Sequence, residues 1–334
     1  MLTIPSLPHL LQAFFHDWLA RQRDASPHTI HAYRDSWRLF LRFVAGRRRR
    51  EVAALALADL TAVEVLAFLE HVERERHGSV NTRNCRLAAL RSFFLFVAAR
   101  EPFVAEQFAA VLRLPTKRST RRSITYLDPE EVAAILAQPD KKTLTGQRDH
   151  VLLALLYNTG ARIQEALSLT PSAVRLDAPA QVRFMGKGRK ERICPLWPET
   201  AGLIGALLRR CPRGAGEPIF TNRFGQPLHA SGVRLRLRQY VAAAERLHPH
   251  LREKRVTPHT FRHTAAVHLV AAGVDVTVIQ SWLGHAYLDT TFLYAQANVE
   301  TKRQALEQVD GIARPSRPPR WKRDAALMAW LDSL

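Results

Sequence analysis

The sequence has few cysteines, and they are not arranged as metal ligands. Cys85, Cys194 and Cys211 are odd in number and widely separated, without the short spacings of a zinc site. The same scatter gives no disulfide framework. Free thiols in a reducing cytoplasm are therefore the expected state.

Long hydrophobic runs and targeting signals are also missing. The sequence has no stretch of 18 or more apolar residues, so no membrane-spanning helix is predicted. The opening MLTIPSLPHLLQAFFHDWL lacks the basic start and small-residue cleavage site of a signal peptide. No lipidation motif suggests a membrane anchor. With 334 residues, 47% of them hydrophobic, we expect a globular protein with two domains and no membrane partner.

Acidic residues are scarce beside basic ones. The chain has 30 Asp and Glu against 49 Lys and Arg, which gives a formal net charge of +19. Such an excess favours a polyanionic partner, and nucleic acid is the first candidate. Charge alone supplies neither sequence specificity nor catalysis, so the function depends on particular residues.

The first third of the chain reads as helices only. Ser26 and Pro27 begin a helix as a side-chain cap and first-turn proline, and Gly46 is predicted to end it. Thr61 with Glu64 forms a capping box that opens a second helix. Helical spacing predicts a core made of Ile30, Tyr33, Trp37, Leu41, Val44, Leu87, Leu90, Phe94 and Val97.

Basic residues on these helices and on the following segment are candidates for DNA binding. We expect Arg83, Arg86 and Arg91 to face outward from a bundle of about four helices. Pro115–Ser123 has no apolar periodicity and reads as a basic linker. Its candidate DNA contacts are Lys117, Arg118, Arg121 and Arg122. Solvated side chains on a helix face, or a solvated tether, would give the same pattern.

The remainder of the chain is predicted to be mainly α-helical with a small sheet. Asp128–Pro129 is a helix start, and Gly160 ends an apolar helix that contains Val151–Tyr157. Gln181–Met185 and Glu191–Pro195 form a hairpin. Further helices are expected at 198–210, 231–247, 258–272 and 275–283. After a proline-rich break at 314–319, a final helix presents an apolar face that must dock on its own domain or on a neighbouring protomer.

The segment from Thr257 to Tyr294 contains side chains unusual for a core. His259 and Arg262 are three residues apart on one helix face, and His285 lies on a turn after a glycine. A phenol is a poor nucleophile at neutral pH, but imidazole and guanidinium groups around it suit attack on a phosphodiester. Two satisfied histidines, a surface arginine and a core tyrosine are the simpler alternative.

Further motifs resemble one family. The stretch 158–167, NTGARIQEAL, is similar to the first-arginine motif of tyrosine recombinases, also called phage integrases, and 186–192, GKGRKER, resembles their lysine hairpin. HTFR at 259–262, LGH at 283–285 and Tyr294 match the remaining motifs in order and at the usual spacing. Such a set in register is a specific signal. The resemblance to this family is close over the C-terminal two thirds of the chain. In the N-terminal part it extends only to helical character and size.

The resemblance implies a domain organisation and a fold class. Residues 1–112 would form a helical, SAM-like core-binding domain, 113–125 a basic linker, 126–313 the catalytic domain, and 314–334 the tail. The fold class is mainly α with a small antiparallel β-sheet. The two domains would clamp DNA together.

The resemblance also implies the role of each site residue. Tyr294 would attack a phosphodiester and become joined to the 3′ side of the break, freeing a 5′ hydroxyl. The other implied roles are Arg162 and Arg262 as phosphate clamps, Lys187 as general acid, His259 as base, His285 as phosphate hydrogen-bond donor, and Glu165 as support that orients its neighbours or holds His259.

Three of these positions have a rival nearby. Lys190 lies close to Lys187, His263 is adjacent to Arg262, and Tyr287 is a second phenol before Tyr294. The family pattern rather than the chemistry excludes them. We expect no metal and no cofactor, because the histidines lie among arginines and no acidic pair stands with them.

The resemblance implies that the protein is a site-specific recombinase or integrase. It would act on double-stranded DNA with specific target sites, as a homotetramer on two sites, alone or with a related recombinase. A mobile element and a bacterial, nucleoid-associated location would fit. A type IB topoisomerase shares the tyrosine chemistry, a catalytically silent DNA-binding regulator is a third class, and a metal-dependent nuclease ranks last.

Overall fold

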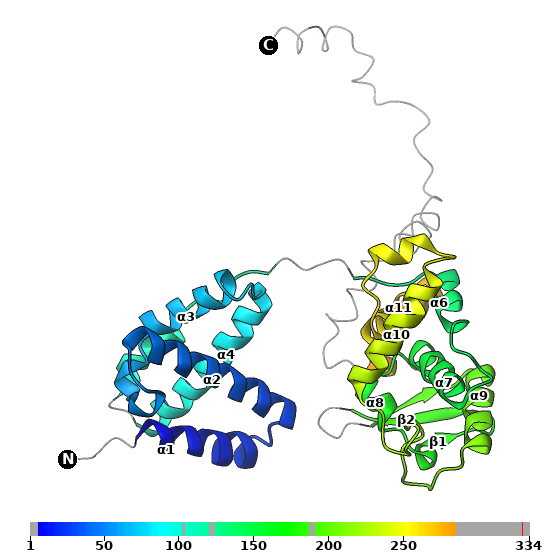
Figure 1. The fold of residues 1–334 in the computed structure, drawn as a ribbon, viewed down its shortest axis with the longest axis horizontal. Helices are drawn as coiled ribbons and strands as arrows, with labels where there is room; N and C mark the ends of the chain where they lie inside the picture. Colours follow the sequence, from blue (N-terminus) through cyan, green and yellow to red (C-terminus); the bar gives the residue numbers. More distant parts are fainter. Residues whose placement is uncertain (1–5, 102–103, 120–123, 187–190, 285–328, 330–334) are drawn as a thin grey trace. The chain divides into compact units, whose positions relative to one another are not determined.

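A computed structural model describes residues 6–101, 104–119, 124–186, 191–284 and 329. It divides into two compact units, Met1–Arg121 and Arg122–Leu334 (Figure 1). The division falls inside the segment 113–125. The predictions for Arg121, Arg122, Lys187, Lys190, His285, Tyr287, Tyr294 and the C-terminal helix lie outside the described residues.

The N-terminal unit is helical throughout its described residues, and hydroxyl caps begin its three long helices. Ser26, Thr61 and Ser79 each accept a hydrogen bond from the backbone amide three residues on. The elements are α1 (Leu7–Gln12), the π-helical η1 (Ala13–Gln22), α2 (Pro27–Arg48), the short 3-10 turns η2 (Val52–Ala54) and η3 (Leu57–Asp59), α3 (Ala62–Arg74), α4 (Val80–Arg100) and α5 (Ala105–Leu112).

Helix α2 continues past Gly46, so the predicted end at that glycine is wrong. The last turn contains Arg47 and Arg48, which pair with Glu64 at 2.9 Å and Asp59 at 2.7 Å. Basic side chains at a helix C-terminus are favourable, and these ion pairs hold the turn that follows the glycine. The helix ends instead at Arg48, and the next residue, Arg49, adopts the left-handed conformation with φ of 51°.

Aromatic rings fill the core of this unit. Phe14 packs against Phe93 and Phe96 with ring centroids 5.4 and 5.5 Å apart, and Trp37 lies 4.4 Å from Phe93. The predicted core positions Trp37, Val44, Leu87, Leu90, Phe94 and Val97 are buried, while Ile30, Tyr33 and Leu41 are partly buried against them. Helical periodicity therefore identified this core correctly.

The prediction that Arg83 faces outward is wrong. Its side chain is only 4% exposed and donates to the carbonyl of Pro115 at 2.9 Å and to Asn84 at 3.1 Å. Arg86 and Arg91 are half-buried on the same helix, and Arg86 donates to the hydroxyl of Ser36. Arg83 consequently ties helix α4 to the chain that follows α5.

The first part of the basic segment is fixed to the N-terminal unit. The backbone of Lys117 exchanges two hydrogen bonds with the side chain of Asn84, at 2.8 and 3.1 Å. The Lys117 ammonium also pairs with Glu73 at 2.7 Å. Arg118 is exposed. Up to Lys117, therefore, the segment is anchored rather than a free tether.

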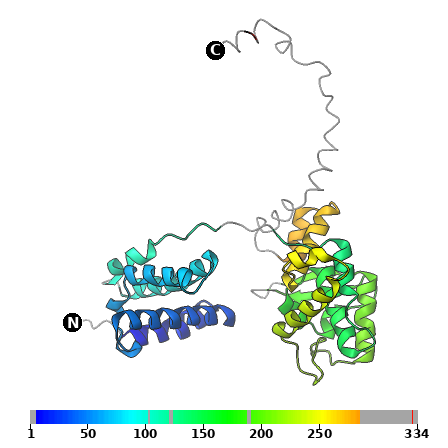
Figure 2. The ribbon, with the colours of Figure 1, turned by 45° about the horizontal axis from the view of Figure 1, so that its top comes forward.

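The C-terminal unit is built around helix α7 (Leu144–Thr159), which packs against α9 and α11 (Figures 1 and 2). Nearly every residue of α7 from Arg148 onward is buried, because neighbours cover it on all sides. The surrounding elements are α6 (Pro129–Leu136), α8 (Ile163–Leu167), the 3-10 turn η5 (Pro171–Ala173), α9 (Pro198–Arg210), α10 (Ala230–Ala244), the 3-10 turn η7 (Pro249–Glu253), α11 (Pro258–Ala271) and α12 (Val276–Leu283).

A three-stranded antiparallel sheet in the order β1-β2-β3 completes this unit. Strands β2 (Gln181–Met185) and β3 (Glu191–Pro195) have the predicted bounds, with Gln181 opposite Pro195. The two-residue strand β1 (Val174–Arg175) was not predicted, because so short a strand has no alternation to detect. The predicted fold class, mainly α with a small antiparallel sheet, is confirmed.

Candidate active site

A glycine turn brings the ends of α7 and α12 together. Gly160 ends α7 in the left-handed conformation with φ of 58°. A Cβ atom at this position would lie 2.5 Å from Cδ2 of Leu283, the last residue of α12. Glycine is therefore required both by the backbone conformation and by the close approach of α12.

Arg162 follows this turn as the N-cap residue of α8, and Glu165 holds it from one side. One oxygen of Glu165 accepts the backbone N–H of Arg162 at 2.8 Å, and the other accepts its Nη1 at 2.8 Å. The Arg162 side chain is 42% exposed, whereas that of Glu165 is 7% exposed. The guanidinium is thus anchored on its protein side and open on the other, as a phosphate clamp requires.

Arg192 on β3 joins the same carboxylate from the opposite side. Its Nη2 donates to Oε2 of Glu165 at 2.8 Å, and its Nε donates to the carbonyl of Trp282 at 3.0 Å. Burial alone would raise the pKa of Glu165, but the hydrogen bonds and charge of Arg192, with those of Arg162, lower it below its ordinary value. Glu165 therefore remains a carboxylate held between two arginines.

Arg192 received no role in the sequence analysis, although it lies in the hairpin motif. The sequence of β3 does not mark Arg192 as inward-facing, because the apolar neighbour Ile193 is the exposed residue, at 58%. Buried and exposed residues alternate along this strand, and Arg192 and Cys194 occupy its two buried positions. A charged residue at an inward strand position needs a buried partner, but the sequence does not show which one.

Arg262, from the first turns of α11, is the most deeply placed of the predicted site residues that the structure describes. Its side chain is among the largest that are fully buried, and the residue is 1% exposed. Nη1 donates to the carbonyl of Gly160 and Nη2 to that of Leu283, both at 2.7 Å. Arg262 thereby joins the C-terminal ends of α7 and α12, a structural role beyond the predicted phosphate contact.

Two histidines lie beside these arginines. The rings of His259 and His263 are 4.3 Å apart in an edge-to-face arrangement. Although His259 keeps an exposed surface, desolvation by the surrounding protein lowers its pKa, and the charges of Arg262 and Arg162 lower it further. His259 is therefore neutral at pH 7 and able to accept a proton.

The pKa of His263 leads to a prediction about acid stability. Burial, with the charges of His259 and Arg262, lowers its pKa to about 4. The folded state then binds fewer protons than the unfolded state, so stability is present above about pH 6.5 and is lost as the pH falls toward 4. Between pH 7 and pH 4, we expect His263→Gln to reduce the loss in the free energy of unfolding by about 2 kcal/mol, a value that allows for partial exposure of the ring.

Urea unfolding of both proteins at several pH values from 7 to 4 checks this expectation. The slope with pH is compared rather than the absolute stability, because glutamine also changes the packing. His259 and His268 have lowered pKa values too, so the variant should retain part of the slope. Identical slopes in the two proteins would contradict the assignment to His263.

No metal centre is found within the described ranges, which contain no cluster of three or more His, Cys, Asp or Glu side chains suited to a metal ion. Within the same ranges, no helix is both long and apolar enough to cross a bilayer. These findings concern only the part of the chain that the structure places.

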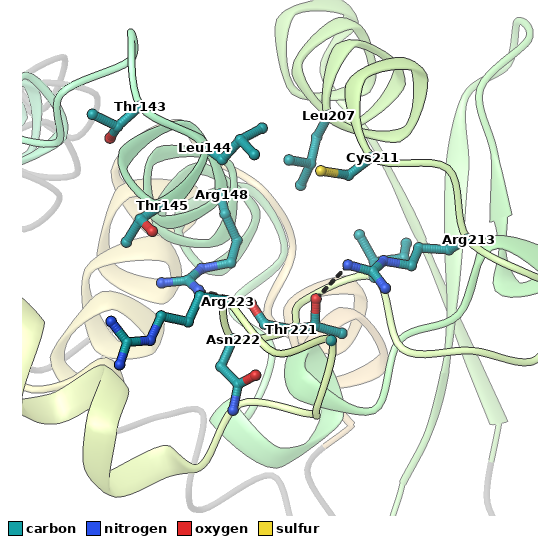
Figure 3. A pocket seen from close by; sticks show the side chains of 12 residues that line it. Thr143, Leu144, Thr145, Arg148, Leu207, Cys211, Arg213, Thr221, Asn222 and Arg223 are labelled. Atoms are coloured by element: carbon teal, nitrogen blue, oxygen red, sulfur yellow. Dashed lines mark hydrogen bonds between the residues drawn. The ribbon is translucent and has the colours of Figure 1, made fainter.

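A cavity of about 370 Å³ lies at the opposite end of α7 from Arg162 (Figure 3). The 16 residues of α7 span roughly 24 Å at 1.5 Å per residue; the cavity lining includes its first residues, and Arg162 follows its last. Arg148 in its lining donates to the carbonyl of Thr221 at 2.7 Å, and Arg213 donates to the hydroxyl of the same residue at 2.6 Å. Both arginines therefore brace the cavity wall through Thr221.

Comparison with known proteins decides the family. Residues 125–301 match the model of the phage integrase family, and residues 11–101 match that of the phage integrase N-terminal SAM-like domain. The chain belongs to the phage integrase family of tyrosine recombinases. It is accordingly a tyrosine-type site-specific recombinase, an enzyme that breaks and rejoins DNA strands.

Relatives of this recombinase match nearly its full length. A putative integrase/recombinase, y4rC, from Sinorhizobium fredii is 38% identical over 98% of both chains. The tyrosine recombinase XerC of Rhodospirillum centenum is 34% identical, covering 89% of this chain and 85% of its own. The Tn1549 transposon integrase, solved with a circular intermediate DNA, shares the fold with a TM-score of 0.66 at 16% identity, covering 90% of this chain and 99% of its own.

Proposed function

We propose that this recombinase cuts and rejoins specific duplex sites through a 3′-phosphotyrosine formed by Tyr294. The observation that carries the proposal is the convergence of Arg162, Arg262 and a neutral His259 at the joined ends of α7 and α12. In the sequence, the last two family motifs, LGH at 283–285 and Tyr294, lie at the end of α12 and shortly after it.

The chemistry follows from the residue types. The Tyr294 oxygen attacks the phosphorus, the bond to the 5′ oxygen breaks, and the phenol proton passes to His259. Lys187 gives a proton to the leaving 5′ oxygen, and His285 donates a hydrogen bond to the phosphate. Arg162 and Arg262 stabilise the charge on the non-bridging oxygens, each contribution being on the order of 100- to 1000-fold in rate.

The proposed assembly is a homotetramer on two DNA sites. Each protomer offers one tyrosine nucleophile, and exchange between two duplexes requires four strand breaks. Specific sites, service to a mobile element and action on the bacterial nucleoid belong to the same proposal. The transposon integrase among the structural neighbours and the integrase named among the relatives support the mobile-element role.

A nicked suicide substrate tests the chemistry. A target arm is selected from a randomised duplex library with the purified protein, and a nick near the cleavage point lets the short product strand diffuse away. Wild-type protein should accumulate a covalent adduct on the 3′ side of the break. An adduct on the 5′ side, or free cut ends without an adduct, contradicts the proposal. Relaxation of plasmids without recombinant product would favour a topoisomerase instead.

Cleavage should not require a divalent metal. Arginine and lysine side chains supply the positive charge in the proposed reaction, so adduct formation in excess EDTA should proceed within about twofold of the rate with Mg²⁺. Single-turnover cleavage of the suicide substrate in each buffer measures this ratio. Loss of cleavage in EDTA that added Mg²⁺ restores would exclude the proposed mechanism.

A further inference from the structure

We propose that Arg192 is a positioning residue for Arg162, acting through Glu165, and this inference rests on the proposed function of Arg162. Arg192 touches the segments that build the site. Its Nη2 donates to Glu165 on α8, its Nε donates to the carbonyl of Trp282 on α12, and its own backbone belongs to β3. Its side chain is 7% exposed, so little solvent competes for these contacts.

The fork of Arg192 is fixed by packing as well as by hydrogen bonds. The guanidinium carbon lies 4.8 Å from the ring centre of Phe184, over the neighbouring strand. On the other side, a Cβ atom at Gly284 would approach Cδ of Arg192 to 3.1 Å. The absence of a side chain at Gly284 therefore lets Arg192 run beneath the end of α12.

The way in which the two oxygens of Glu165 are shared between donors determines the direction in which the Arg162 guanidinium points. Arg192 takes Oε2 together with the Arg162 backbone N–H, which leaves Oε1 for Nη1 of Arg162. Without Arg192, both oxygens become available to the Arg162 guanidinium, and a forked carboxylate pair is the stronger arrangement. Such a pair would turn both terminal nitrogens of Arg162 toward Glu165 and away from a phosphate.

The net charge of the cluster also favours phosphate binding when Arg192 is present. Two guanidinium groups share one buried carboxylate, so the cluster of Arg162, Arg192 and Glu165 keeps one positive charge. A neutral residue at position 192 would cancel that charge. Arg192→Lys retains it but cannot supply two donors at fixed angles to Glu165 and Trp282, so this variant separates geometry from charge.

The test compares cleavage in two backgrounds. We expect Arg192→Lys to slow single-turnover cleavage of the suicide substrate by on the order of 100-fold, the effect of a misplaced catalytic group. DNA affinity should remain within about twofold, because the Arg192 side chain is only 7% exposed and offers little surface to a ligand. In an Arg162→Lys background, where the fork of Arg162 is already lost, the same change should cost less than about threefold.

Arg175→Lys on β1 is the matched control, because this arginine is exposed and its side chain donates to the nearby carbonyl of Ala178. It should cleave at the wild-type rate. A purely structural role of Arg192 would reduce cleavage by the same factor in both backgrounds, and that result overturns the inference. Wild-type cleavage by Arg192→Lys overturns it as well. If Arg162→Lys alone cleaves normally, the proposed role of Arg162 fails, and this inference falls with it.

Discussion

Tyr294→Phe should bind the selected DNA arm with wild-type affinity and form no covalent adduct on the suicide substrate. The substitution removes one hydroxyl and keeps the ring, so it is the smallest change that removes the proposed nucleophile. The hydroxyl oxygen is the only atom of the tyrosine side chain that can form a bond to phosphorus. A gel that separates protein–DNA adducts under denaturing conditions, run beside a native binding gel, measures both properties.

Tyr287→Phe is the matched control for this experiment. Tyr287 is the other phenol in the same stretch of sequence, and the family motif rather than its chemistry excluded it as nucleophile. We expect its variant to form adduct in normal yield. The reverse result, with adduct lost in Tyr287→Phe and kept in Tyr294→Phe, would move the nucleophile to Tyr287.

Local signals in the sequence were enough to predict many of the elements. The bounds of β2 and β3 were predicted because two short segments flank a Gly-Lys-Gly turn in the sequence, which is typical of a hairpin. The start of α6 was predicted because Asp128 can cap a helix and Pro129 suits its first turn, and the structure adds a bond from the Asp128 amide to Glu131. In both cases the interacting residues are neighbours in the chain.

Arginine side chains were the least predictable feature, because their partners are distant in the sequence. Arg83 was expected on a DNA-facing surface, yet it is buried against Pro115. Arg192 was read as part of a motif, yet it crosses to Glu165 and to Trp282. A long side chain with several donors can reach many partners, and only the fold selects among them.

Arg162 and Arg262 were predicted to have the same catalytic role, but their surroundings differ. The Arg162 guanidinium is part-exposed and bonded to a carboxylate close in the chain. Arg262 is buried, and two of its nitrogens satisfy carbonyls at the ends of two helices. We therefore expect the lysine variants of the two arginines to agree in catalysis and to differ in stability.

Both Arg162→Lys and Arg262→Lys should slow single-turnover cleavage by on the order of 100- to 1000-fold, because each loses a guanidinium proposed to stabilise the charge on the phosphate. Arg262→Lys should also destabilise the catalytic unit. A lysine cannot reach the carbonyls of Gly160 and Leu283 with the same geometry, and a buried carbonyl left without a donor costs about 1–3 kcal/mol. Arg162→Lys can keep its ion pair with Glu165 and should unfold like the wild type.

Calorimetry of the full chain separates the two variants. For a unit of this size, a loss of about 2 kcal/mol lowers the melting temperature by roughly 4–8 °C. That shift is expected for Arg262→Lys and not for Arg162→Lys. Equal melting temperatures with equal losses of cleavage would mean that the bonds from Arg262 to α7 and α12 contribute nothing to stability. Arg262 would then serve the phosphate alone, and the ends of the two helices would be held by the approach of Leu283 to Gly160.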